Sequence, residues 1–196
     1  MISFLLKGYI EVFEAELVKQ RSLSKNNNSF YLWTTVLFEF LVFSFLGWIV
    51  ETIDVLIVAG EWTWRGLIAY GLPMIHIYGL GGLIIVYVFG RLRDKPITFF
   101  LITTLTMTAF ELFSSYFEEA LTGLRTWDYS DKLFSFFDGR ICLSSSLGWG
   151  LLSVFVLYFV HPFLLAFEEK VPRKILYPIV WAVGIYTMIC IYIQYF

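Results

Sequence analysis

Long, nearly uninterrupted runs of apolar residues constrain this chain more than any other feature of its sequence. Each run exceeds the roughly 20 residues that an α-helix needs to cross a bilayer. The five runs cover residues 31–59, 66–90, 97–120, 141–166 and 175–196. Hydrophobic residues make up 59% of the chain, which is more apolar surface than a water-soluble core can hide. The sequence therefore predicts an all-α protein, a polytopic transmembrane helix bundle with about five spans.

The chain before the first run has a different pattern. Residues 1–20 place apolar side chains at three- and four-residue intervals, with charged residues mostly between them. This pattern predicts an amphipathic helix that lies on the membrane surface. Its acidic residues do not suit the apolar centre of a secretory signal. We predict two parts: an amphipathic N-terminal segment with its linker, residues 1–29, and a single transmembrane helical domain, residues 30–196.

Basic residues are distributed unevenly among the connections between the runs. With the N-terminus in the cytoplasm, most Lys and Arg residues fall on the cytoplasmic side, as the positive-inside rule requires. The residues on that side are Lys7, Lys19, Arg21, Lys25, Arg91, Arg93, Lys95, Lys170, Arg173 and Lys174. We therefore expect a cytoplasmic N-terminus and, after five spans, a C-terminus on the outside.

Two acidic residues, Glu51 and Glu111, lie well inside predicted spans. A charge in hydrocarbon is costly, so such residues usually face the bundle interior, a partner charge or a water-filled cavity. Helix geometry places both carboxylates about 20 Å from the cytoplasmic edge of a core about 30 Å thick. The outer half of the bundle is therefore the predicted location of a polar site.

Two interpretations of this outer half remain open. In the first, a pocket open to the outside binds a ligand or a cation at Glu51 and Glu111, and Arg65 and Arg140 balance the charge. In the second, buried salt bridges pin the helices together, for example Glu51 or Asp128 with Arg140. The sequence alone does not choose between them.

The second run contains several glycines and Pro73. Close helix packing explains most of the glycines. Pro73 removes a backbone donor, and broken helices commonly build transporter sites. His76 and His161 are interpreted as structural histidines, although His76 could also join a proton relay with the acidic residues of the outer half.

Several classes of function are not supported. The net charge of −2 gives no basic surface for nucleic acid. The sequence has no glycine-rich phosphate loop, zinc-protease motif or nucleophile elbow, and Cys142 and Cys190 have the spacing of neither a metal site nor a redox pair. We expect no catalytic residue, no metal and no cofactor.

Three segments carry a specific pattern. FSFLGWIVE ends at Glu51, PMIHIYGLGGL starts at Pro73, and the run WDYS, residues 127–130, is followed closely by Gly139 and Arg140. Their order and spacing resemble the ABC-transporter type IV permease family (CmpB-like), bacterial polytopic membrane proteins. This family often has a second proline where this chain has His76, which leaves the strength of the break in the second run open.

The resemblance implies a set of ligand-binding residues, nearly all in the outer half. They are Trp48, Glu51, Arg65, Tyr78, Glu111, Glu119, Trp127, Asp128, Tyr129 and Arg140, with Ser130 and Gly139 in the same signature. Two of them, Trp127 and Tyr129, are expected to form a lid over the solute.

The family implies an integral membrane, permease-like subunit of an ABC-type transporter in a bacterial inner membrane. Such a subunit would bind a small polar or charged solute and depend on a separate ATPase subunit, and it could form oligomers. Two alternatives stay open: a noncatalytic membrane partner or sensor with structural salt bridges, and an intramembrane enzyme acting on lipid-linked substrates.

Overall fold

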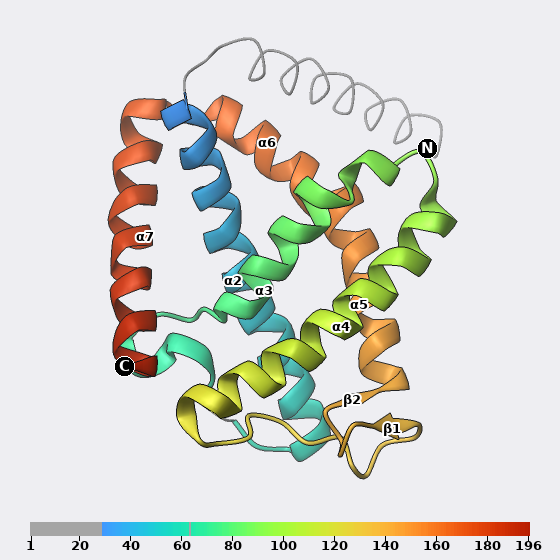
Figure 1. Cartoon of the computed structure of the whole chain (residues 1–196). Coiled ribbons are helices and arrows are strands. Elements are labelled where there is room, and N and C mark those ends of the chain that lie inside the picture. Colours follow the sequence, from blue (N-terminus) through green and yellow to red (C-terminus); the bar gives the residue numbers. More distant parts are fainter. Residues whose placement is uncertain (1–28, 63) are drawn as a thin grey trace.

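The computed structural model describes residues 29–62 and 64–196, and helices dominate this part (Figure 1). The elements are α2 (Ser29–Ala59), η1 (Gly66–Tyr70), α3 (His76–Leu83), η2 (Ile84–Val88), η3 (Gly90–Leu92), α4 (Pro96–Thr122), β1 (Ser135–Phe136), β2 (Ile141–Cys142), α5 (Leu143–Phe155), η4 (Val156–Val160), α6 (His161–Lys170) and α7 (Arg173–Tyr195). Elements η1 and η3 are 3₁₀ turns, whereas η2 and η4 are π-helical turns. The predicted amphipathic helix, residues 1–20, lies outside the described residues.

Four of the described helices are long and apolar enough to cross a membrane. They are Ser29–Ile57, Pro96–Thr122, Leu143–Lys170 and Arg173–Tyr195. Between 28% and 50% of the residues in their most apolar windows are buried within the protein, so at least half of each window faces outward, where lipid would solvate it. The chain is a membrane protein, and the prediction of an all-α transmembrane bundle is confirmed.

The second predicted span differs from the expectation of one continuous helix over residues 66–90. Regular helix begins only at His76, and α3 and η2 have 8 and 5 residues. Together they rise roughly 20 Å, less than a hydrocarbon core of about 30 Å. Pro73 accounts for the break, because proline has no N–H and disfavours helix at the residue before it. The Ile75 N–H donates instead to the Ser44 carbonyl of α2 at 3.0 Å.

Helix α3 packs against both α2 and α4, and α2 also packs against α7. Glycines allow the contact between α2 and α3. A Cβ atom added at Gly47 would overlap Tyr78, and one added at Gly82 would overlap Phe43. The packing role predicted for the glycines of the second run is confirmed at Gly82, and Gly47 of the first run has the same role.

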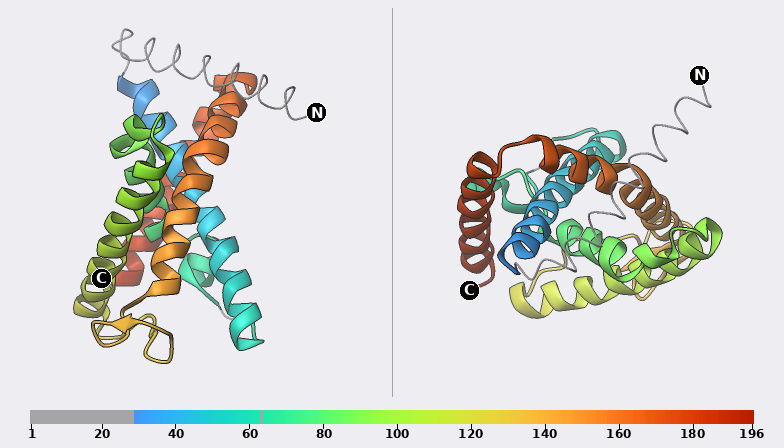
Figure 2. Two further views of the ribbon diagram at one scale, coloured as in Figure 1. Left: turned by 90° about the vertical axis from the view of Figure 1, so that its right-hand side faces the viewer. Right: turned by 90° about the horizontal axis from the view of Figure 1, so that it is seen from above.

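The bundle has two different ends, which are visible in both side views (Figures 1 and 2). Helices α2 and α4 finish, and α5 starts, at the end that carries the loop of residues 123–142, which we call the loop end. The opposite end carries the start of α2 and the connections before α4 and α7 (Figure 1). We call it the basic end, because Arg91, Arg93, Lys95, Lys170, Arg173 and Lys174 lie there.

Candidate functional site

The predicted site residues come together at the loop end, because alternate helices run in opposite directions. Residues from the end of α2, the start of α3, the second half of α4 and the start of α5 meet the loop there. Four smaller groups of contacts make up this polar region: three join different elements, and the fourth lies within the loop.

The first group centres on Glu51 of α2. An oxygen of its carboxylate lies 2.7 Å from a guanidinium nitrogen of Arg65, and the two side chains are 23% and 29% exposed. The Tyr78 hydroxyl also lies beside Glu51. The ring of Tyr78 stacks on Trp149 of α5 with 5.1 Å between centroids, so this group connects three helices and the segment before η1.

The second group surrounds Glu111 of α4, which is only 5% exposed. Its carboxyl oxygens accept hydrogen bonds from the Tyr129 hydroxyl at 3.2 Å and from the Ser145 hydroxyl at 3.0 Å. Trp149 lies beside the same carboxyl. Burial and the neighbouring Glu111 raise the pKa of the Tyr129 hydroxyl, so this loop residue stays protonated and can donate.

The third group surrounds Arg140, which is 8% exposed. Its guanidinium donates to the Ser115 hydroxyl at 2.8 Å, pairs with the Glu119 carboxylate and lies 4.0 Å above the Tyr116 ring. The hydrogen bond to Glu119 raises the pKa of Arg140. The suggested pairing of Arg140 with Glu51 or Asp128 was therefore wrong. The physical reason is the spacing of the residues on α4. Glu119 lies four residues after Ser115 and three after Tyr116, so all three share the face of α4 that Arg140 contacts.

The fourth group orders the loop itself. The Trp127 indole N–H donates to the Arg140 carbonyl at 3.0 Å, and the Arg125 Nε donates to the Trp127 carbonyl at 3.1 Å. The Asp128 carboxylate accepts from the Ser130 hydroxyl at 2.6 Å and from its backbone N–H at 2.8 Å. These bonds from Ser130 lower the pKa of Asp128. Asp128 therefore stabilises a turn beside Arg140, with Arg125 as its ionic partner at 3.5 Å.

Gly139 closes this turn with a φ of +78°. A Cβ atom at this position would overlap the Asp128 carboxylate and the Ser130 hydroxyl. Gly139→Ala should therefore break the turn as well as strain the backbone, and we expect a loss of about 2–3 kcal/mol in the free energy of unfolding.

Gly123→Ala is the matched control, because Gly123 has a φ of +69° with nothing within 4 Å of its added Cβ. It should lose only about 1–2 kcal/mol. Thermal unfolding of both variants in detergent tests this, and equal losses would contradict it.

The Asp128 turn should also depend on pH. A carboxylate with a lowered pKa in the folded protein stabilises it above the ordinary aspartate pKa of about 3.9, and this contribution disappears as the pH falls through the folded value. Wild type should therefore melt at a higher temperature than Asp128→Asn at neutral pH, and the difference should shrink below about pH 4. Melting curves across this range measure the difference, and a difference that is constant with pH would argue against the turn.

Glu118 was not among the predicted site residues. Its carboxylate accepts from the Thr126 hydroxyl at 2.6 Å and from the Tyr195 hydroxyl at 2.9 Å. The Tyr195 hydroxyl also lies 3.0 Å from His76 Nε2, which agrees with a structural histidine. The spacing of Glu111 and Glu118 by two helical turns could have revealed that both face the same side of α4.

Four polar atoms near this region are buried without a hydrogen-bond partner in the described part of the chain. One is His76 Nδ1, and the other three belong to groups that can donate: Trp48 Nε1, Thr52 Oγ1 and Arg140 Nε. Trp48 and Thr52 lie one turn apart on α2 and so share a face, while the Trp48 ring contacts Trp62 edge to face at 6.1 Å. Buried polar groups are nearly always satisfied in proteins, so these three donors are candidates for contact with a ligand.

The family described as "Putative ABC-transporter type IV" matches residues 38–194. The chain belongs to this family. The match includes every predicted site residue, and it extends through α7, which contributed little to the resemblance seen in the sequence. No curated protein matches the chain, and no solved structure does.

Proposed function

We propose that this member of the ABC-transporter type IV family is a permease-like membrane subunit that binds a small polar or charged solute at the loop end. The observation that carries the proposal is the set of three unsatisfied donors, Trp48, Thr52 and Arg140, at the same end of the bundle as the buried Glu111 carboxyl. The three donors can bind a solute that carries oxygen acceptors. Glu111 can bind an amino group of that solute, or a cation that accompanies it.

The contacts around Glu111 suggest how the site would admit a solute. Tyr129 hydrogen-bonds Glu111 from the loop, and Trp127 is fixed to the Arg140 carbonyl beside it. A solute that reaches Glu111 would replace the Tyr129 hydroxyl, so the loop would act as a lid. Glu51 and Arg65, which pair at 2.7 Å, would set the charge at the rim.

The distribution of basic residues supports an orientation for this subunit. The basic end would face the cytoplasm of a bacterium, and the loop end would face outward. The sequence has no phosphate-binding loop of its own, so ATP hydrolysis would come from a separate subunit that docks at the basic end. Solute would then reach the site from outside the inner membrane.

Ligand-induced thermal stabilisation tests the solute site. Purified protein in detergent is melted with a panel of small amino acids, amines, carboxylates and metal salts, and a binder is expected to raise the melting temperature of wild type. Glu51→Gln and Arg140→Gln should lose this increase. Asp131→Asn, whose side chain is 75% exposed in the same loop, should keep it. If the ligand raised the melting temperature equally in wild type and in all three variants, the site would be ruled out.

A noncatalytic membrane partner or sensor is the second candidate, and the pairing of the charges favours it. Glu51 pairs with Arg65, and Arg140 pairs with Glu119, as expected of salt bridges that hold helices together. Copurification from the native membrane separates the two functions. A stable ATPase subunit supports transport, whereas an envelope enzyme or a kinase as the stable partner supports the sensor.

A further inference from the structure

A second buried polar group lies in the half of the bundle nearer the basic end, away from the proposed solute site. Glu39 of α2 is fully buried, and its Oε1 lies 2.7 Å from Nδ1 of His161, which is 2% exposed. The other carboxyl oxygen, Oε2, is buried without a hydrogen-bond partner among the described residues. An unsatisfied carboxylate oxygen at this depth is costly unless it binds a proton or a cation.

The backbone around this pair is unusual. The π-helical turn η4 ends immediately before His161, and a second π-helical turn, η2, carries Tyr87 beside Glu39. The two π turns contact each other. Such turns are rare in proteins and are frequent at functional sites. Pro162 also removes a backbone donor at the same place, so the helix is widened where His161 enters the bundle.

Two further buried polar side chains, Thr35 and Glu168, lie closer to the basic end than the pair, and we call these four residues the column. Thr35, one turn before Glu39 on α2, donates to Glu168 of α6 at 2.8 Å. Thr35 and Glu168 are both almost fully buried. Glu168 also lies seven residues after His161, so the two α6 side chains share a face. The column therefore places Glu39 and His161 at its inner end and Glu168 at its outer end.

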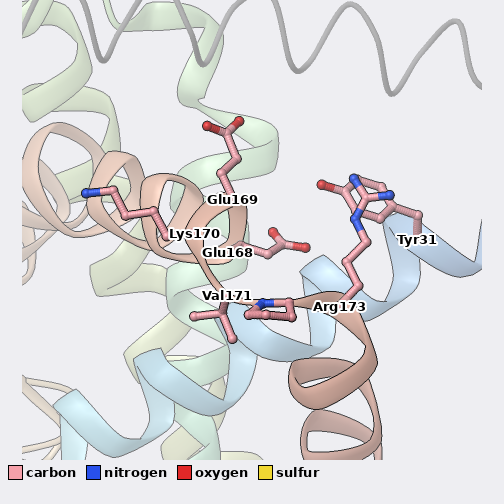
Figure 3. A pocket seen from close by; sticks show the side chains of 7 residues that line it. Tyr31, Glu168, Glu169, Lys170, Val171 and Arg173 are labelled. Carbon is pink, nitrogen blue, oxygen red and sulfur yellow. The ribbon is translucent and has the colours of Figure 1, made fainter.

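Glu168 lines a hollow of about 330 Å³ at the basic end, together with Tyr31 and Arg173. Figure 3 shows its carboxylate pointing toward the side of Tyr31 and Arg173, while Glu169 points away from them. The Arg173 guanidinium lies 4.5 Å over the Tyr31 ring. The hollow has room for several water molecules, so water can reach the carboxylate at the mouth of the column.

We propose that Glu39 and His161 form a proton-binding site that is filled from the hollow through Glu168 and Thr35. A hydronium ion in the hollow gives a proton to the Glu168 carboxylate and becomes water. Glu168 passes a proton to the Thr35 hydroxyl, which releases its own proton to Glu39 Oε2, so Glu168 and Thr35 end as they began. The net change is one O–H bond lost from hydronium and one formed at Glu39, whose Oε1 keeps its hydrogen bond with His161, and the charge of the pair rises by one. Because this contact joins α2 to α6, proton binding changes the attachment of the two helices. The site does not depend on the proposed solute binding.

Other charged and titratable groups face the column from the surrounding elements. Tyr87 of η2 lies beside Glu39, and Tyr177 of α7 lies beside Glu168. Arg93, which follows η3, donates to the Leu157 carbonyl of η4 at 2.8 Å. Arg173 lies at the mouth of the column. A proton therefore binds in a region that already holds both signs of charge, which is typical of proton pathways in membrane proteins.

Difference infrared spectroscopy on the full-length protein tests this site. Spectra recorded as a pH series should contain a carboxylic acid band that rises as the pH falls and shifts in heavy water. The band should disappear in Glu39→Gln and persist in the exposed control Asp131→Asn. His161→Gln removes the titratable ring and should move the midpoint of the band. No band in wild type, or an unchanged midpoint in His161→Gln, would overturn the site whether or not Glu39→Gln folds.

A second variant separates the pathway from the site. Thr35→Val keeps the shape of the side chain but removes the hydroxyl that donates to Glu168. After a rapid change of pH, the carboxylic acid band should rise several-fold more slowly than in wild type, with the same midpoint. An unchanged rate would show that protons do not enter through Thr35.

Discussion

Gly47→Ala should lower the free energy of unfolding by about 1–3 kcal/mol. An added Cβ would overlap Cβ and Cγ of Tyr78, atoms close to the backbone of α3 that cannot move unless the helix moves. The overlap with Cβ and Cγ of Tyr78 is therefore relieved only if α2 and α3 move apart. Reversible unfolding in mixed micelles, followed by circular dichroism, measures the loss.

Gly148→Ala is the matched control for this contact. Gly148 lies within α5, and nothing approaches within 4 Å of an added Cβ. Alanine favours helix over glycine by about 1 kcal/mol, so this variant should be as stable as wild type or slightly more stable. If Gly47→Ala were equally harmless, the close contact between α2 and α3 would be wrong.

Glu111→Leu should also cause a large loss of stability, about 2–4 kcal/mol. The substitution leaves the Tyr129 and Ser145 hydroxyls without their common acceptor, and an unsatisfied buried polar group costs about 1–3 kcal/mol. Glu111→Gln retains one acceptor oxygen and should lose less than half as much. Unfolding in mixed micelles compares the two variants. A Glu111→Leu protein more stable than wild type would mean that the carboxyl is retained for function at the expense of stability.

The sequence predicted the helices best where a long apolar run is bounded by a proline or a glycine. The run at 97–120 corresponds to α4, which starts at Pro96 and ends at Thr122, immediately before Gly123 with its left-handed backbone. The run at 66–90 was the exception. Its hydrophobicity is continuous, but Pro73 interrupts the backbone, and hydropathy carries no information about backbone hydrogen bonds.

The positions of the buried acidic residues along the bundle were predicted better than their partners. Counting depth along each helix brought Glu51 and Glu111 to one end of the bundle, and both lie there. Their partners depend on helix rotation and loop conformation, which the sequence does not reveal. Arg140 therefore pairs with Glu119 rather than with Glu51.

Glu39 was missed for a different reason. The first predicted run covers residues 31–59, and Glu39 lies near its cytoplasmic end, where an acidic side chain needs no explanation. In the structure α2 begins at Ser29, so Glu39 lies almost three turns into the helix. His161, its partner, is 122 residues away in the sequence, and no local pattern connects the two.

The dissociation constant of a solute found by thermal stabilisation tests the central claim most directly. Equilibrium binding to purified wild type, Glu111→Gln and Asp131→Asn should show at least about tenfold weaker binding, or roughly 1.4 kcal/mol, for Glu111→Gln alone. Asp131→Asn should bind as wild type does, because its side chain is 75% exposed and lies outside the four contact groups. Equal dissociation constants for all three proteins would contradict a solute site at the loop end.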